Sequence, residues 1–294
     1  MPRMPDRDPG RTPDSGSGRA TAGVAPGTSP HTMLVYSSTR RDDVAVTTWI
    51  GAALERGEKV FLRHAPAEDR RVLRLLDDSG LAVRERGPVE LMDAAAVGRR
   101  CRGRRVPLRE LHVELADQAV RDGYTGMAMV SNAAANAVLT ADRQELVGHE
   151  QDLEWLAAEG RLRALCRYHP RTEEALLPGM LALHHRDVDD DIWAASVDGG
   201  QLRLRGEIDA SNADRVAHVL DAGLAEGVRV VSLAELQFCA VAGVRVFLAA
   251  ADRLASRDGE LVLVDVDPLV ARNFAITAGD GRRGLRLVPR GPAQ

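Results

Sequence analysis

The first half of the chain carries hydroxyl, amide and imidazole side chains directly after several short apolar runs. Such groups suit the orientation of a modest polar ligand in an apolar cleft. In an open parallel sheet, ligands bind at the carboxyl ends of the strands. Polar residues also occur at strand ends simply because these ends reach solvent, and the sequence leaves both interpretations open. The positions concerned are Ser37, Ser38, His64, Ser131, Asn132, Tyr168 and His169.

Glu150 is the acidic residue with the least ordinary predicted surroundings. Helical spacing places it on the same stripe as Leu146, Leu153 and Ala157. A carboxylate on that stripe is partly desolvated and needs a partner, which could be a ligand donor or an arginine. Alternatively, Glu150 lies at the edge of the stripe with its carboxylate in water. Both possibilities stay open at this stage.

Motif spacing predicts neither a metal site nor a nucleotide site. His149 and Glu150 resemble the beginning of a zinc-protease helix, but Leu153 stands where that motif needs its second histidine. The other histidines are scattered, and no cysteine pair has ligand spacing. The phosphate-binding motif Gly-x-x-x-x-Gly-Lys-Ser/Thr is absent, because the single lysine, Lys59, has no glycine before it and no hydroxyl after it. We therefore expect no metal, no cofactor and no enzymatic activity.

The composition favours a two-domain cytoplasmic protein. A chain of 294 residues has room for two domains, and its 45% hydrophobic content is enough for sizeable cores. No apolar run approaches a membrane span, and the N-terminus lacks the apolar core of a signal peptide. The three cysteines, Cys101, Cys166 and Cys239, are an odd number at unrelated spacings and indicate reduced thiols.

The charge pattern does not indicate a nucleic-acid partner. The formal net charge is −4, and the strongest basic run, Arg99–Arg105, lacks the aromatic residues or the helix motif of nucleic-acid binders. A solvated loop is the preferred interpretation of this run, and contact with phosphate or an acidic partner is the alternative.

The order of apolar segments predicts a tail and an α/β domain. Residues 1–30 are rich in Pro, Gly, Ser, Thr and Arg, and we expect them to be disordered. Residues 31–188 alternate strands and helices, which predicts a mostly parallel sheet covered by helices on both sides. The boundary to a second domain, at 192–290, falls in the acidic segment and strand at 187–195. The predicted strands lie at 33–36, 59–64, 89–92, 126–131 and 161–168, and the helices end near 56, 78, 121, 159 and 185.

The second domain is predicted as a strand–helix–strand–helix–strand series. Strands are expected at 201–206, 228–233 and 260–266. The first helix has Ser211 or Asn212 as its N-cap. The buried stripes of the two helices are expected to comprise Val216, Val219, Leu220 and Leu224 in the first, and Val241, Val244, Leu248, Ala251 and Ala255 in the second.

The turn before the second helix carries no hydroxyl group. A residue at a helix start meets unpaired N–H groups and the positive end of the helix dipole, so Ser or Asp caps the helix there and a phosphate binds well. Ala240 offers no acceptor, and an Ala in place of a good cap costs about 0.5–2 kcal/mol. Val241 and Ala242 have no oxygen to phosphorylate. This turn therefore cannot serve as a serine switch.

The second domain resembles the STAS domain, the fold of the anti-sigma factor antagonists. The resemblance rests on Gly206-Glu-Ile-Asp209 at a strand end, the strand-turn-helix at 228–255 and the span to Val288. In that family the turn reads Phe-x-Asp-Ser-Ser-Gly, and a serine is the phosphorylation switch. The resemblance implies that this end of the sheet binds an anti-sigma factor or a related serine kinase. The implied contact residues are Asp209, Asn212, Ala240, Val241, Ala242 and Gly243.

Two blander interpretations of the same residues remain. Any parallel strand-turn-helix unit has a similar pattern, and Asp209 and Asn212 could simply cap the following helix.

The first domain resembles the MEDS domain, a sensory module of methanogen and methylotroph regulators. The matching features are His31 with Tyr36, the segment Ala53-Leu-Glu-Arg-Gly-Glu-Lys-Val60, the segment Asp122-Gly-Tyr-Thr-Gly-Met127, and Leu165-Cys-Arg-Tyr168 after the helix that bears Glu150. The resemblance implies a RecA-like α/β fold and the sensing of small organic molecules. The predicted ligand contacts are His31, Tyr36, Ser37, His64, Glu150 and Tyr168.

Together these features predict a cytoplasmic regulator that binds an anti-sigma factor or related protein under the control of its sensory domain. One alternative is a small-molecule sensor whose second domain serves only assembly. A less favoured alternative is an unrecognised enzyme.

Overall fold

The computed structural model describes residues 29–65, 69–81, 87–171, 174–278 and 282–291, so the predicted tail at 1–30 lies almost wholly outside the described residues. The N-terminal domain alternates strands and helices as predicted. Its elements are β1 (His31–Val35), α1 (Thr39–Glu55), β2 (Lys59–His64), α2 (Asp69–Asp78), β3 (Val89–Asp93), α3 (Ala94–Cys101), α4 (Arg105–Arg121), β4 (Met127–Asn132), α5 (Ala133–Leu139), α6 (Arg143–Ala158), β5 (Leu162–Tyr168) and α7 (Leu177–Leu183).

The C-terminal domain begins with two antiparallel strands and continues as strand–helix units. A short strand, β6 (Asp187–Asp189), precedes it. The other elements are β7 (Trp193–Asp198), β8 (Gln201–Ile208), α8 (Ala213–Ala225), β9 (Val230–Cys239), α9 (Val241–Ala255), β10 (Leu261–Val266), α10 (Pro268–Ala278) and β11 (Leu285–Pro289).

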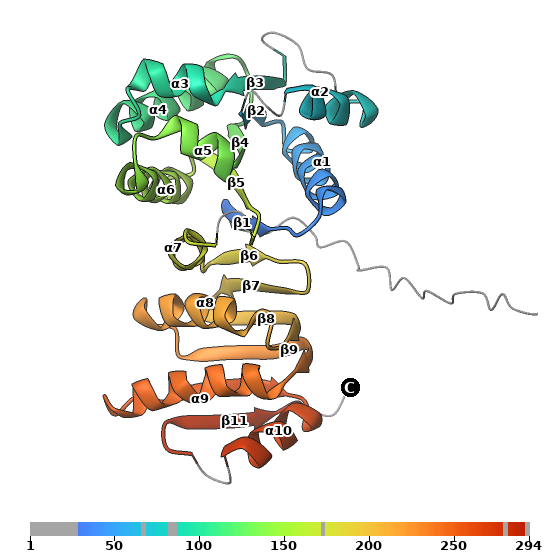
Figure 1. The fold of residues 1–294 in the computed structure, drawn as a ribbon, viewed down its shortest axis with the longest axis vertical. Coiled ribbons are helices and arrows are strands. Elements are labelled where there is room, and N and C mark those ends of the chain that lie inside the picture. Colours follow the sequence, from blue (N-terminus) through green and yellow to red (C-terminus); the bar gives the residue numbers. More distant parts are fainter. Residues whose placement is uncertain (1–28, 66–68, 82–86, 172–173, 279–281, 292–294) are drawn as a thin grey trace, which may run out of the picture.

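One sheet runs through both domains (Figure 1). Its strand order is β11-β10-β9-β8-β7-β6-β1-β5-β4-β2-β3. The strands from β3 to β6 are parallel, β7 is antiparallel to both β6 and β8, and the strands from β8 to β11 are parallel. The two domains are therefore joined through backbone hydrogen bonds as well as through the chain itself.

Helices cover both faces of the N-terminal sheet, which confirms the predicted architecture. On one face, Trp49 and Ile50 of α1 and Leu76 of α2 pack against Leu34 and Val130. On the other face, helices α4 and α6 pack their apolar stripes onto alternate residues of the same strands. Because successive side chains of a strand point to opposite faces, strands covered on both sides are buried throughout, as β2 and β4 are, including their polar residues Arg63 and Asn132.

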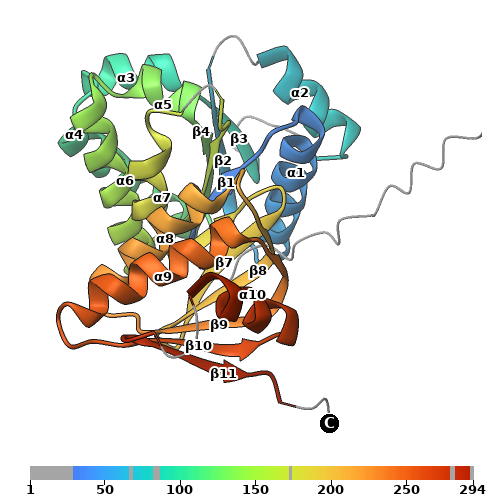
Figure 2. The same ribbon diagram turned by 60° about the horizontal axis from the view of Figure 1, so that its bottom comes forward.

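The C-terminal sheet carries its helices α8, α9 and α10 on one face (Figure 2). Strand β8 accordingly alternates buried Leu202 and Leu204 with exposed Arg203. In α9 the buried stripe includes Phe247, whereas Val241, which the sequence placed on that stripe, is 43% exposed. Val241 is the first residue of the helix.

Several short elements were not predicted from the sequence. Helices α3 and α5 are alanine-rich and only eight and seven residues long, so their apolar periodicity is too short to detect. The predicted helix ending near 185 is shortened to α7, and α10 and β11 complete the C-terminal domain. The basic run Arg99–Arg105 is only partly a loop: residues 102–104 link the end of α3 to the start of α4, and Arg99, Arg100, Arg102 and Arg104 are exposed. There Arg105 pairs with the buried Asp152 at 2.7 Å.

The acidic segment between the domains binds elements on both sides of the boundary. The Thr32 hydroxyl donates to Asp187 at 2.8 Å. Arg41 of α1 pairs with Asp191 at 2.8 Å, and Arg215 of α8 pairs with Asp190 at 3.0 Å. The segment therefore fixes α1 and α8 to the strand that joins the two domains.

Across the described residues, no helix combines the length and the apolar character needed to cross a membrane.

Candidate functional site

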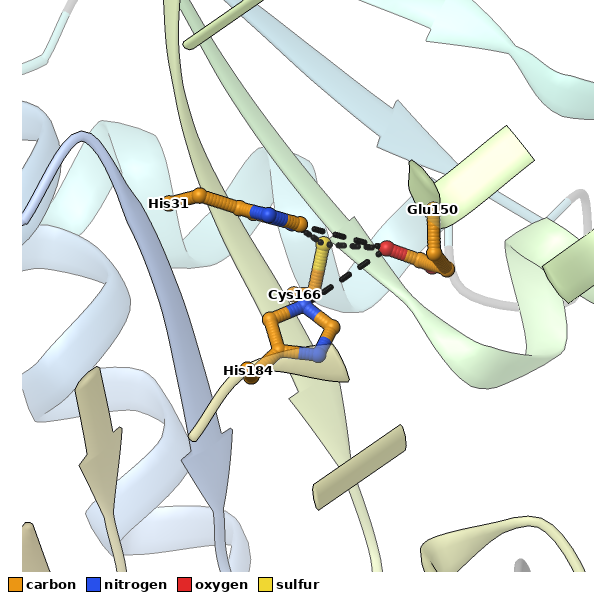
Figure 3. Close-up of side chains that lie close together, drawn as sticks. All are labelled: His31, Glu150, Cys166 and His184. Carbon is orange, nitrogen blue, oxygen red and sulfur yellow. Dashed lines mark hydrogen bonds and ion pairs between the residues drawn. The ribbon is translucent and has the colours of Figure 1, made fainter. Parts of the chain in front are cut away.

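Four side chains with metal-binding or acid–base chemistry meet inside the N-terminal domain: His31, Glu150, Cys166 and His184 (Figure 3). They come from β1, α6, β5 and the residue that follows α7. All four are buried, with at most 1% of each residue exposed. We call these four residues the central cluster.

Strand alternation and register bring the central cluster together. His31 and Met33 point to the same face of β1, and Met33 pairs with Cys166 of the parallel strand β5. Helix α6 lies over this face and directs Glu150 inward together with Leu153. Helix α7 ends at Leu183, and the next residue, His184, lies beside the same face of the sheet. The cluster therefore lies between sheet and helices, not at the carboxyl ends of the strands.

The functional atoms of the cluster lie close to van der Waals contact. Nε2 of His31 is 3.5 Å from Sγ of Cys166 and 3.5 Å from Oε2 of Glu150. The Cys166 sulfur is 3.3 Å from the same carboxylate oxygen. Nε2 of His184 is 3.6 Å from that oxygen. Glu150 Oε2 is thus the point to which the other three side chains are directed.

Hydrogen bonds behind the cluster fix the orientation of each ring and of the carboxylate. Nδ1 of His31 is 2.9 Å from Oε2 of Glu154. Nδ1 of His184 is 2.8 Å from the Met180 carbonyl oxygen. Carbonyl and carboxylate oxygens can only accept, so both Nδ1 atoms carry a proton. The other oxygen of Glu150, Oε1, accepts from the Tyr168 hydroxyl and from the Asn136 amide, each at 2.9 Å.

Burial and mutual charge shift the pKa of every member of the cluster. Burial alone lowers the pKa of His31, but Cys166, Glu150 and Glu154 outweigh it and raise that pKa well above its usual value. Burial raises the pKa of Glu150, yet the hydrogen bond from His31 and the neighbouring imidazoles bring it below its ordinary range. Burial and the His31 charge lower the pKa of His184 to about 4. Burial and the Glu150 charge raise the pKa of the Cys166 thiol.

A second buried group, around Arg63, adjoins the cluster. The Arg63 guanidinium is fully buried and donates to Nε2 of His149 at 3.0 Å and Nε2 of His112 at 2.6 Å. Burial and the Arg63 charge lower the pKa of His149 to about 3, so its ring is neutral and accepts. Asn136 accepts from Arg63 at 3.3 Å and donates to Glu150, and so connects the buried cation with the buried carboxylate.

The structure brings together three of the six predicted ligand contacts. His31 and Glu150 belong to the central cluster, and Tyr168 donates its hydroxyl proton to Glu150. Tyr36 instead stacks edge-on against His169, and the backbone N–H of Ser37 donates to Asp191 at 2.9 Å. His64 ends β2 with Nδ1 3.4 Å from the Ala65 carbonyl oxygen.

The interpretation with the Glu150 carboxylate in water is wrong, because Glu150 is completely buried. Sequence reasoning missed Cys166, His184, Glu154 and Asn136 as members of the site. Two of these residues had a local signal in the sequence. Glu154 lies one helical turn after Glu150, and Cys166 lies two residues before Tyr168, on the same face of its strand.

An open groove of about 640 Å³ lies elsewhere on the N-terminal domain, along the outer side of α4 and α6. Trp155 and alternating charged side chains line it, including Arg109, Glu114 and Arg121. It is not at the strand ends, where the sequence predicted a ligand cleft.

In the C-terminal domain, the turn between β9 and α9 lies beside the end of β8. The Ala240 N–H donates to the Ile208 carbonyl oxygen at 2.8 Å. A Cβ atom on Gly243 would lie 2.6 Å from Ile208 Cγ2 and 2.8 Å from Cys239 Sγ, so only glycine permits this close approach of helix and strand. Ala240 occupies the N-cap of α9 and makes no side-chain cap, as expected.

The neighbouring loop at 209–212 is held by its own side chains rather than by helix capping. Asn212 takes the N-cap position of α8 without capping it. Its buried amide accepts from the Asp209 N–H at 2.9 Å and donates to the Glu207 carbonyl oxygen at 2.8 Å. Asp209 accepts from the Ser211 N–H at 2.7 Å, and its hydrogen bonds with Ser211 lower the pKa of the Asp209 carboxyl. Asn212 is therefore the N-cap residue of α8, as one of the two predicted candidates, but its side chain holds the loop instead of capping the helix.

The surface beside this turn is apolar and exposed. Phe238 is 49% exposed and Val241 is 43% exposed. Leu269 and Ile276 of α10 are more exposed still and lie seven residues apart, on one helical stripe. Asn273, on the same stripe, donates to the Cys239 carbonyl oxygen at 3.0 Å, so the stripe adjoins the turn. We call Phe238, Val241, Leu269 and Ile276 the apolar patch.

Two family models match the chain. Residues 30–185 match the model described as MEDS, "MEthanogen/methylotroph, DcmR Sensory domain". Residues 194–289 match the model described as "Mlab, STAS domain". Both resemblances predicted from the sequence are confirmed, in the predicted order. Comparison with curated proteins gave no significant match. A sensory domain followed by a STAS domain fits a signalling regulator, and the STAS domain indicates interaction with another protein.

Proposed function

Because the chain belongs to the MEDS family and continues into a STAS domain, we propose that it is a cytoplasmic anti-sigma factor antagonist. In this role the STAS domain binds an anti-sigma factor or a related serine-kinase-type regulator, under the control of the sensory domain. The protein acts by binding and not by turnover.

The exposure of the β9–α9 turn is the observation that carries this proposal. Monomeric proteins seldom expose contiguous apolar surface without using it for binding. The apolar patch includes Phe238 and Val241 on either side of the turn, which are 49% and 43% exposed. The N-terminal domain packs at the opposite edge of the C-terminal sheet, beyond β7 (Figure 1), and leaves the turn open to a partner.

Control by phosphorylation at the turn is excluded by the residues themselves. Positions 240–242 are Ala, Val and Ala, which offer no hydroxyl oxygen. Regulation is therefore assigned to the sensory domain. Helix α7 of that domain packs against α8 of the STAS domain, and the shared sheet joins them through β6 and β7. These contacts can transmit a conformational change in the sensory domain directly to the STAS domain.

A binding titration tests the proposal. The full chain is titrated with individually purified serine-kinase-type anti-sigma factors from the same organism. We expect one of them to bind, and Val241→Arg to weaken binding on the order of 100-fold, because it places a charge in the centre of an apolar interface. Val120→Arg, on a somewhat more exposed apolar position of α4, is the control and should bind like the unchanged chain.

Phosphorylation is tested in the same mixtures. After incubation with the bound kinase and Mg-ATP, mass spectrometry should find no phosphate on residues 240–243. Failure of every such kinase to bind, or equal binding by Val241→Arg and the unchanged chain, would rule the proposal out.

A further inference from the structure

We propose that His31, Glu150, Cys166 and His184 form a four-coordinate binding site for a divalent transition metal ion, and that zinc is the ion they suit best. This inference concerns the sensory domain and does not depend on the partner proposed for the STAS domain.

Four of the six separations between the donor atoms match those around a tetrahedral ion, and all six are at most 4.8 Å. Zinc binds imidazole nitrogen, carboxylate oxygen and thiolate sulfur at about 2.0–2.3 Å, so neighbouring ligand atoms of a tetrahedron lie about 3.3–3.7 Å apart. The separations from Glu150 Oε2 to the sulfur, to His31 Nε2 and to His184 Nε2 are 3.3, 3.5 and 3.6 Å. His31 Nε2 and Cys166 Sγ are 3.5 Å apart. An ion can therefore enter with small adjustments of the side chains.

One donor atom of the cluster is left without a hydrogen-bond partner within the described part of the chain. Both Nδ1 atoms are protonated toward oxygen acceptors, so the neutral His184 ring presents its Nε2 lone pair to the cluster, and His31 does the same once its second proton is released. The Glu150 oxygen also accepts only. Nε2 of His184 is buried and has no hydrogen-bond partner among the residues that the structure describes. A buried lone pair that faces a carboxylate oxygen is unfavourable, and a shared cation satisfies both while it displaces the protons of His31 and of the Cys166 thiol.

The hydrogen bonds behind the donors are those that metal ligands usually have. A histidine that binds a metal donates its other N–H to a carboxylate or a backbone carbonyl, which fixes the tautomer and orients the ring. His31 has Glu154 in this position, and His184 has the Met180 carbonyl. Tyr168 and Asn136 occupy the second oxygen of Glu150 and leave the first one directed into the cluster.

The ligand set favours zinc and a closed site. Nitrogen, sulfur and oxygen donors in tetrahedral array suit zinc better than the oxygen-preferring magnesium or calcium. Four protein ligands leave no coordination position for water or substrate, which is typical of structural sites. His184 directly follows α7, and α7 packs against α8 of the STAS domain. An ion at this site would thus fix the segment that connects the two domains to β1, β5 and α6.

Metal binding is measured first on the unchanged full chain, kept reduced with a phosphine that does not bind zinc. The chain is stripped with a chelator and then titrated with Zn²⁺ in competition with a chromophoric chelator. We expect one tight equivalent and a higher melting temperature with zinc, since an ion that binds the native state stabilises it. With Co²⁺ as a spectroscopic substitute, we expect the visible bands of tetrahedral cobalt and a near-ultraviolet thiolate charge-transfer band.

Variants then assign the ligands. Cys166→Ala and His184→Ala should lose more zinc affinity than the about 10–100-fold that follows loss of an outer hydrogen-bond partner. Cys101→Ala removes a buried thiol elsewhere in the same domain, and His185→Ala removes the neighbouring imidazole, which faces Glu226. Both controls should bind zinc like the unchanged chain.

Three results would overturn the proposal. These are no zinc binding by the reduced chain, unchanged affinity in Cys166→Ala, or a cobalt complex without the thiolate band. In each case the four residues form only a hydrogen-bonded network with a thiol donating to Glu150. If the alanine variants do not fold, the cobalt spectrum of the unchanged chain decides.

Discussion

Nδ1 of His31 lies 2.9 Å from Oε2 of Glu154, while the other nitrogen of the same ring faces Glu150 and Cys166. Glu154 therefore acts as a positioning residue for the proposed metal ligand. Glu154→Ala should lower zinc affinity by about 10–100-fold, because the ring loses its orientation and part of its basicity. The zinc affinity of Glu154→Gln should lie between those of Glu154→Ala and the unchanged chain, since its amide oxygen still accepts from Nδ1. The measurement is competition with a chromophoric chelator.

Glu159→Gln, on an exposed carboxylate at the end of the same helix, controls for the change in net charge. Equal affinities for Glu154→Ala and the unchanged chain would contradict the positioning role.

Asp187 makes the folded protein sensitive to pH. Burial raises the pKa of Asp187 from 3.8 to about 6. The charge of Asp189 also raises this pKa, and the charge of Arg205 lowers it. The folded state thus binds a proton more tightly than the unfolded chain, and stability falls as pH rises from about 4 to 6. Asp187→Asn removes this loss and keeps the acceptor for the Thr32 hydroxyl.

The variant should therefore be more stable than the unchanged chain by about 1–3 kcal/mol near pH 7.5 and show no advantage near pH 4. Urea unfolding at both pH values measures this difference. Asp198→Asn, an exposed carboxylate, should show no such pH dependence. A destabilised Asp187→Asn at neutral pH would mean that the charge is needed.

Asp42 neutralises a buried arginine. Arg167 is 3% exposed and donates to both carboxylate oxygens of Asp42 at 2.8 and 2.9 Å. Removing one partner of a buried ion pair leaves the other charge uncompensated, so Asp42→Asn should lower the free energy of unfolding by about 3–5 kcal/mol. The exposed pair of Arg161 and Asp117 provides the control, and Asp117→Asn should change stability by less than about 1 kcal/mol. Similar losses in both variants would show that burial does not decide the outcome.

The sequence predicts the elements whose apolar periodicity is long, such as α1 and α6, because that signal is local. It does not predict β6, which is three residues long and acidic, since this strand forms by pairing with β1 on one side and β7 on the other. The central cluster has the same origin. His31 and Cys166 are 135 residues apart, and only the strand order places them face to face.

The spacing of residues in the sequence did not predict this site, and the reason is physical. Each ligand comes from a different element, so no pair has the short spacing of a zinc finger or a zinc-protease helix. Glu150 was recognised because a carboxylate on an apolar stripe is unusual in itself. His184 carries no such local signal.

Gly243 sets how closely α9 approaches the sheet beneath the apolar patch. A methyl group there would meet Ile208 Cγ2 at 2.6 Å and Cys239 Sγ at 2.8 Å, and both atoms are in the packed core. Gly243→Ala should therefore destabilise the protein by about 1–3 kcal/mol through overpacking. Gly51→Ala, in the middle of α1, meets no atom within 4 Å and should be neutral or stabilising by up to about 1 kcal/mol. Thermal unfolding of the two variants separates close packing from helix propensity. If Gly243→Ala were as stable as Gly51→Ala, the helix would be free to shift, and the turn would not be the rigid binding surface that the proposed function requires.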